Sequence, residues 1–127
     1  MRSGTFATAV VLLPSFAFCS NKDQKFGVQL YSFRDEMAKD ALGTLKKIAS
    51  IGISEIESAR SKKGHYYGLS PEAMKKACND LGMKLISGHV ALDGNFEKTM
   101  EEAVASGQEY LICSSMPSSG QNIDNYK

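Results

Sequence analysis

The sequence predicts an α/β fold in which a parallel sheet carries its helices on the outside, as in the closed (β/α)8 or TIM barrel. A short apolar segment, an amphipathic segment and a glycine recur along the chain, with the glycines at Gly52, Gly82 and Gly107. The apolar segments are too short and apolar to face solvent, which is typical of buried parallel strands. Segment 32–36 after the first strand lacks the glycines of a doubly wound nucleotide-binding sheet, which favours the barrel.

The first repeat begins with the β-prone run 26–31, which is rich in branched and aromatic residues and is bounded by polar stretches. A helix is expected to follow, with Asp40 accepting hydrogen bonds from its first N–H groups. Its apolar residues recur at helical spacing and are Leu42, Leu45, Ile48 and Ala49. Gly52 is expected to end this helix.

The second repeat combines a strand at 53–56 with a helix that opens at 70–72, where Pro71 at the first helical position loses no hydrogen bond. Its apolar stripe is Met74, Ala77, Cys78 and Leu81. The third repeat combines a strand at 84–87 with a helix before Gly107, and a fourth strand follows at 110–113. The stripe of that helix is Phe96, Met100, Ala103 and Val104.

Length limits how much of a barrel the chain can form. A barrel of this type takes roughly 250 residues, whereas this chain has 127. We therefore expect residues 25–127 to form the N-terminal half of a barrel, with about the first four strands and three helices, and 122–127 to open a further helix. Its unpaired strand edges favour aggregation or pairing with another chain, such as a homo-oligomer.

Residues 1–19 are interpreted as a secretory signal peptide outside the fold. Arg2 precedes an uncharged stretch at 6–18, which Pro14 interrupts. That stretch is shorter than the roughly 20 apolar residues that a membrane-spanning helix needs. The protein is therefore expected to be exported to the periplasm or the outer surface.

Two readings of the processing site stay open. The small residues Ser15 and Ala17 suit cleavage after Ala17. Cys19 allows a lipoprotein signal instead, although Phe18 is bulky where such a signal usually has a small residue. The expected membrane contact is limited to this signal or to a lipid on Cys19.

Composition gives no support for a polymeric partner. Fifteen Lys and Arg residues balance fourteen Asp and Glu residues, and no run of like charge indicates a nucleic-acid arm. Cys78 and Cys113 form no close-spaced metal motif and imply no particular disulfide. Both are expected to be small buried apolar residues.

Candidate functional residues lie at the carboxyl ends of the predicted strands, where the loops of a parallel βα fold converge. Glu57 follows the second strand and could act as a base, bind a metal or hold a sugar hydroxyl; the alternative is a loop glutamate paired with Arg60. His89 follows the third strand and could bind a metal or move a proton, with a structural histidine as the alternative. Gly88 is expected to permit close backbone approach and a sharp turn before it.

Substrate-binding side chains are expected at two further places. Tyr31 and Arg34 follow the first strand and could hydrogen-bond a polyol or clamp a phosphate, unless Arg34 only bridges to an acidic neighbour such as Asp35. Tyr66 and Tyr67 lie in the long loop after the second strand, where aromatic rings could cover a sugar ring. Surface packing of that loop is the alternative for the two tyrosines.

The segments 27–34, 43–49 and 52–57, together with Ser87-Gly88-His89, resemble exported bacterial sugar phosphate isomerase/epimerases of the xylose-isomerase-like barrel class. The resemblance continues through 67–71, 81–84 and 111–113. It implies metal-assisted isomerisation or epimerisation of a small carbohydrate through an enediol-type intermediate, with no nucleic-acid partner. The implied cofactor is a divalent ion such as Mn, Mg, Co or Zn.

Within that resemblance, Glu57 and His89 match strand-end positions that line the pocket. In the related endonuclease IV branch a histidine near the place of His89 binds zinc, whereas in the epimerase branch it more often faces substrate. The resemblance implies that the main metal ligands lie beyond Lys127, so the 127-residue chain is expected to be inactive alone. The alternatives are a non-catalytic exported carbohydrate-binding barrel and a nuclease, which the near-neutral charge and export disfavour.

Overall fold

The computed structural model describes residues 24–114 and Asp124. It contains a parallel sheet with the strands in the order β1 (Gly27–Gln29), β2 (Glu55–Ala59), β3 (Lys84–Val90) and β4 (Tyr110–Cys113). The connections contain η1 (Leu30–Phe33), α1 (Arg34–Lys39), α2 (Ala41–Ser50), α3 (Pro71–Asp80) and α4 (Phe96–Ser106). The expected signal peptide 1–19 lies outside the described residues, as does the helix expected at 122–127 apart from Asp124.

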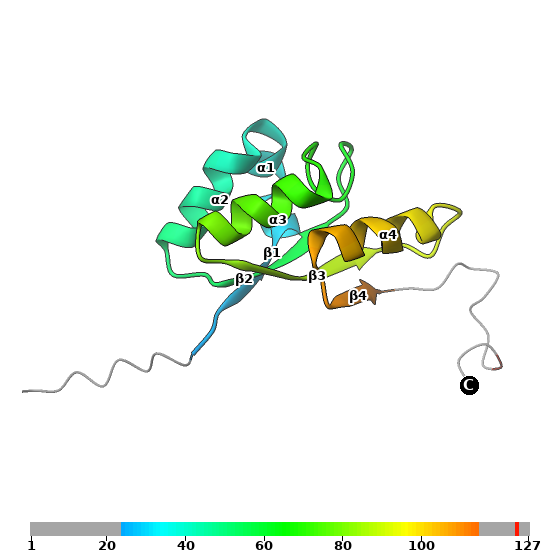
Figure 1. The fold of residues 1–127 in the computed structure, drawn as a ribbon. Helices are drawn as coiled ribbons and strands as arrows, with labels where there is room; N and C mark the ends of the chain where they lie inside the picture. The colour runs from blue at the N-terminus through cyan, green and yellow to red at the C-terminus, as the bar shows by residue number, and fades with distance from the viewer. Residues whose placement is uncertain (1–23, 115–123, 125–127) are drawn as a thin grey trace, which may run out of the picture.

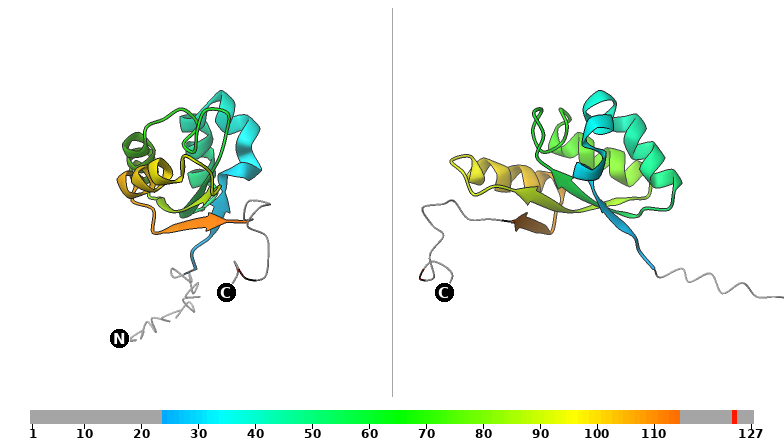
Figure 2. Two further views of the ribbon diagram at one scale, coloured as in Figure 1. Left: turned by 90° about the vertical axis from the view of Figure 1, so that its right-hand side faces the viewer. Right: turned by 180° about the vertical axis from the view of Figure 1, so that it is seen from behind.

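The four α-helices lie on one face of the sheet, as Figure 1 and the two views of Figure 2 show. Strand order follows chain order, and each neighbouring pair is parallel. A doubly wound sheet would carry helices on both faces and reverse its strand order. The one-sided arrangement is that of the barrel class, so the predicted fold class is confirmed for these four strands. The face opposite the helices is called the open face below.

Local signals place the helix ends where the sequence predicts them. The Asp40 carboxylate accepts a hydrogen bond from the Gly43 N–H at 2.9 Å, and the Ser70 hydroxyl accepts one from the Ala73 N–H at 3.1 Å. The three glycines predicted to end helices all have positive φ; Gly107, at +75°, adopts the left-handed conformation that follows α4. The helices therefore begin and end largely through their own sequence.

Segment 32–36, expected to connect the first strand to its helix without structure of its own, is helical. It contains the end of η1 and the start of α1, and these two helices bury only Leu30 and Met37. Six residues with one buried apolar side chain give no helical periodicity to detect, so α1 could not be predicted from the pattern. The strand before it is shorter than predicted, at 27–29, whereas β2 and β3 extend to Ala59 and Val90.

The core fills the space between the sheet and the helices. Its fully buried large side chains include Leu30, Leu45, Ile48, Ile56 and Met74. Three residues predicted to lie in the apolar stripes are exposed: Leu42, Met100 and Val104, the last with 80% of its surface accessible. α4 packs against α3 and buries only Ala103 and Ser106, so its opposite flank has no described residue over it. None of the described helices is long and apolar enough to cross a membrane.

The two described cysteines differ in environment. Cys78 is fully buried under α3, where burial raises the pKa of its thiol to about 11. Cys113 is exposed at the end of β4, so its predicted burial is wrong. β4 is an edge strand of the described sheet, and its side chains have a neighbouring described strand on one side only.

Alkylation should separate these thiols. At pH 8 about one in a thousand Cys78 thiols is ionised and the side chain has no access to solvent, so iodoacetamide should modify Cys113 about a hundredfold faster. Peptide mapping by mass spectrometry measures the two rates separately and distinguishes both peptides from the one that contains Cys19. Equal rates in native protein would contradict the packing of α3, and unfolding in guanidinium should equalise them.

Candidate functional site

Four polar side chains from three neighbouring strands meet on the open face. The register pairs Gln29 with Glu57, Glu57 with Ser87, and Ala59 with His89. On β1 and β2 the neighbouring residues Val28 and Ile56 pack against the core, so Gln29 and Glu57 point the other way because strand side chains alternate. Gln29, Glu57, Ser87 and His89 are called the polar cluster below.

The carboxylate of Glu57 is the centre of the polar cluster. Its Oε1 accepts a hydrogen bond from Gln29 Nε2 at 2.5 Å, and its Oε2 accepts one from Ser87 Oγ at 3.0 Å. His89 Nδ1 lies 3.8 Å from Oε1. The side chain of Glu57 is 20% exposed and that of His89 is 35% exposed, so a ligand can reach both. Two neutral donors thus orient a carboxylate beside an imidazole.

The hydrogen bonds of Gln29 also select the tautomer of His89. Facing the negatively charged Glu57, the Gln29 side chain must present its NH₂ group rather than its carbonyl oxygen. The same nitrogen lies 3.1 Å from His89 Nδ1, so its second hydrogen points to the imidazole. Nδ1 therefore accepts, and in neutral His89 the proton is on Nε2, which lies 3.2 Å from Ser114 Oγ.

An irregularity in β3 brings Ser87 and His89 to this face. Ile56 pairs with Leu85, but the next residue of β2, Glu57, pairs with Ser87, so β3 has one extra residue at Ile86. Leu85 packs in the core, and strict alternation would point Ser87 to the same side. A bulge of this kind re-aims the side chains that follow it, and it is rare between parallel strands.

Gly88 serves a purpose other than the predicted sharp turn, since β3 continues through it to Val90. On the helix side of the sheet, Gln108 Nε2 donates a hydrogen bond to Ser58 Oγ at 2.7 Å. A Cβ on Gly88 would lie 2.6 Å from Gln108 Oε1 and 2.9 Å from Ser58 Oγ. Glycine therefore leaves room for a polar contact directly behind the polar cluster.

Tyr31 joins the site, whereas Arg34 lies beside it. A pocket of about 320 Å³ at the carboxyl end of the strands is lined by Gln29, Tyr31, Ala59, Arg60 and His89. The Arg34 guanidinium packs over the Tyr31 ring, 4.8 Å from the ring centre, and its Nε lies 4.0 Å from Asp35. The alternative interpretation of Glu57, a pairing with Arg60, is wrong, because Arg60 Nη1 lies 3.1 Å from Asp93.

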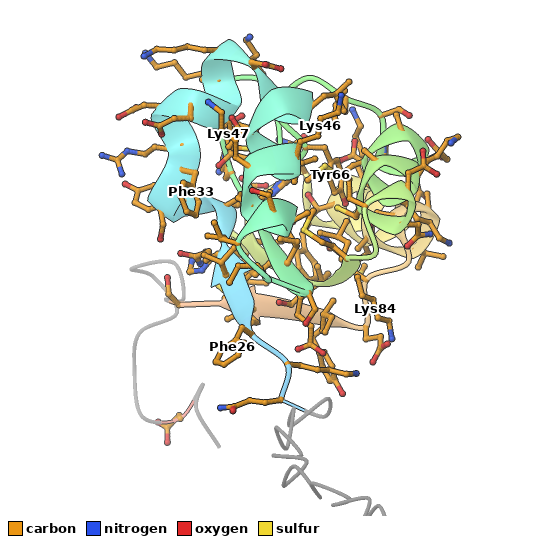
Figure 3. The ribbon with its side chains drawn as sticks, turned by 90° about the vertical axis from the view of Figure 1, so that its left-hand side faces the viewer. Phe26, Phe33, Lys46, Lys47, Tyr66 and Lys84 are labelled. Atoms are coloured by element: carbon orange, nitrogen blue, oxygen red, sulfur yellow. The ribbon has the colours of Figure 1, made fainter. Side chains whose placement is uncertain are left out.

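Tyr66 and Tyr67 do not form the expected lid. Both are 4% exposed and belong to the core, and Figure 3 labels Tyr66. Tyr66 donates its hydroxyl hydrogen to Ser106 Oγ and Tyr67 donates to the Leu30 carbonyl, each at 3.2 Å. Burial raises the pKa of both hydroxyls. The loop folds inward because each ring gains core contacts while its hydroxyl keeps a partner.

Sequence reasoning missed Gln29, Ser87 and Arg60. Gln29 and Ser87 each precede a predicted site residue by two positions, so a search for polar side chains with period two would have found them. The bulge at Ile86 precedes both Ser87 and His89, so these two residues still alternate regularly and lie on the same face. Arg60 follows β2 directly and entered the predictions only as an alternative partner of Glu57.

The described residues do not provide a complete site for a divalent metal. No group of three His, Cys, Asp or Glu side chains among them could hold one. Glu57 and His89 could supply two ligands, but both carboxylate oxygens and both imidazole nitrogens already face hydrogen-bond partners. The metal ligands expected beyond Lys127 stay a prediction.

The chain is similar in structure to two sugar phosphate isomerase/epimerases from Parabacteroides distasonis. One superimposes with a TM-score of 0.62 at 28% sequence identity, over 74% of this chain and 42% of that one. The other has a TM-score of 0.56 at 21% identity, over 73% and 39%, and therefore shows the fold alone. The chain thus spans about two fifths of either length. No protein-family model and no curated protein matches it.

The inferred tautomer is open to direct measurement. Two-dimensional long-range ¹H–¹⁵N spectra should show His89 protonated at Nε2 in its neutral form, because Gln29 donates to Nδ1. Gln29→Leu removes that donor and should increase the Nδ1–H population. An Nδ1–H tautomer in the unaltered protein would contradict the orientation assigned to Gln29.

A methyl group at position 88 should destabilise the fold. Gly88→Ala pushes the Gln108 amide away from Ser58 and should lower the free energy of unfolding by about 1–3 kcal/mol. The control is Gly94→Ala, where the added carbon meets nothing within 4 Å. Urea unfolding followed by circular dichroism measures both variants, and equal stabilities would show that Gln108 can move at no cost.

Proposed function

We propose that this chain supplies part of the active site of an enzyme that isomerises or epimerises a sugar or sugar derivative. The observation that carries the proposal is the orientation of Glu57 and His89 by Gln29 beside an accessible pocket. Similarity to a structure named sugar phosphate isomerase/epimerase supports the same class of reaction. The fold alone would not, because barrels serve many chemistries.

Isomerisation and epimerisation of a sugar through an enediol-type intermediate both begin with removal of a proton from a carbon next to a carbonyl group. A carboxylate close to that carbon can accept the proton, and a hydrogen-bond donor at the carbonyl oxygen stabilises the negative charge that develops. In this proposal Glu57 is the base, and His89 donates from Nε2 after substrate displaces Ser114. Gln29 is a positioning residue whose amide nitrogen contacts both Glu57 and His89.

Tyr31 and the pocket around it give the substrate its place. The exposed phenol ring borders the same pocket as His89 and Gln29, and the Arg34 guanidinium packs over that ring. A phenol can hydrogen-bond a sugar hydroxyl while its ring packs on C–H groups. The divalent metal, export and a lipid on Cys19 stay predictions, and the step described uses none of them.

Proton exchange tests the proposal. The natural gene product that contains these residues is incubated in D₂O with aldose and ketose sugars and their phosphates, with and without Mn²⁺ or Mg²⁺, and loss of the C–H signal beside the carbonyl is followed by ¹H NMR. Glu57→Gln should lower the exchange rate about 10²–10⁴-fold.

The matched control is Glu101→Gln, which makes the same change on the exposed surface of α4 and should leave the rate unaltered. Sugar binding with neither proton exchange nor conversion of the sugar under any metal condition would contradict the enzyme. That result would favour the alternative, a carbohydrate-binding protein without catalytic activity.

A further inference from the structure

His65 lies in the loop between β2 and α3, which is green in Figure 1, and its Nδ1 atom is buried without a hydrogen-bond partner. Buried polar atoms of folded proteins nearly always have such a partner, and leaving one unpaired costs free energy. A neutral imidazole can keep its single hydrogen on Nε2, which leaves only a lone pair at Nδ1. Protonation adds a hydrogen at Nδ1, where no described residue accepts it. The closed loop is therefore compatible with neutral His65 and opposes the charged form.

The charged groups around His65 compensate a positive charge on it only in part. Asp93, in the connection from β3 to α4, and Glu102, on α4, would attract an imidazolium, whereas Arg60 repels it. Each carboxylate already faces a cation: Asp93 lies 3.1 Å from Arg60, and Glu102 lies 3.8 Å from Lys98. Burial outweighs the two carboxylates and lowers the pKa of His65.

The loop that contains His65 is fastened at two points and strained next to them. The Tyr66 hydroxyl donates to Ser106 Oγ, and the Tyr67 hydroxyl donates to the Leu30 carbonyl. Tyr67 has a φ of +55°, a left-handed conformation that is costly for residues other than glycine. Such strain persists only while the surrounding contacts hold it. One unfavourable change beside the tyrosines therefore shifts the loop toward opening.

A hollow of about 370 Å³ beside the loop gives the His65 ring a route to water. The charged and titratable residues that line it are Arg60, Lys62, His65, Asp93, Lys98 and Glu102. Arg60 also borders the pocket of the candidate site that contains His89. Movement of the loop therefore alters one border of that pocket.

We propose that the loop between β2 and α3 is an acid-sensitive latch, which is closed while His65 is neutral and opens when its imidazole is protonated. In the open state the ring enters the hollow, where water can accept hydrogen bonds from both of its N–H groups. There His65 has the ordinary pKa of a solvated histidine, which is higher than its pKa in the closed loop. The closed state is therefore favoured above about pH 6.5 and loses this advantage as the pH falls below that value. The latch is independent of the reaction proposed for the polar cluster.

Hydrogen–deuterium exchange of the full chain at pH 7.5 and pH 5.0 tests the latch. Protection factors, which correct for the intrinsic effect of pH on exchange, should fall about five- to thirtyfold in peptides from 61–69 and stay constant in β3. His65→Leu removes the titrating group and leaves no unpaired nitrogen, so protection of its loop should not depend on pH. His89→Asn is the matched control, because it replaces the other of the two histidines and should leave the pH response intact.

An NMR titration of both histidine rings provides a second measurement that needs no variant. Protonation of His65 should occur at a pH below the ordinary pKa of a solvated histidine, and the loss of protection at 61–69 should follow it. Unchanged protection at 61–69 while His65 is protonated would overturn the latch. Loss of protection that persists in the His65→Leu protein, or that extends equally to β3, would overturn it as well.

Discussion

The single extra residue in β3 is the constraint on which the polar cluster depends. β2 alternates regularly, so Ile56 packs in the core and Glu57 faces outward. β3 can meet that pattern with Ser87 and His89 only because Ile86 interrupts its own alternation. If Ile86 took a regular place in the alternation, the hydroxyl and the imidazole would point at the apolar underside of the helices, where an unpaired polar group costs about 1–3 kcal/mol. The bulge thus allows Leu85 to pack in the core while Ser87 and His89, which follow it, face the polar cluster.

The repeated units could be predicted from sequence because each is determined locally. Asp40, Ser70 and Gly107 mark helix ends by interactions within a few residues, and Leu45 or Ile48 mark a buried face by spacing alone. The strand order then follows from the short βα connections. No comparable local signal exists for α1, whose only buried side chain is Met37.

The candidate site could be predicted only in part, for a related reason. Glu57 and His89 lie near strand ends, where parallel βα folds collect functional groups, and this rule found them. Which atoms they contact depends on the register between β2 and β3. That register changes at a bulge, and no residue type in 84–87 predicts it. Tyr66 and Tyr67 show the opposite error, since a polar loop context suggested exposure although each hydroxyl has a partner inside the core. In both cases the surroundings of the side chains depend on hydrogen-bond partners that are distant in the sequence.

The inward tyrosines have a consequence for how the chain tolerates changes in length. The connection between β2 and α3 is the longest described and would look like a spacer that accepts insertions. It is instead fastened to the first and third repeats, through the Leu30 carbonyl and Ser106. Inserted residues or grafted peptides would disturb three units at once there. The turn around Gly94, which has open space on its outer side, is the more permissive position for such engineering.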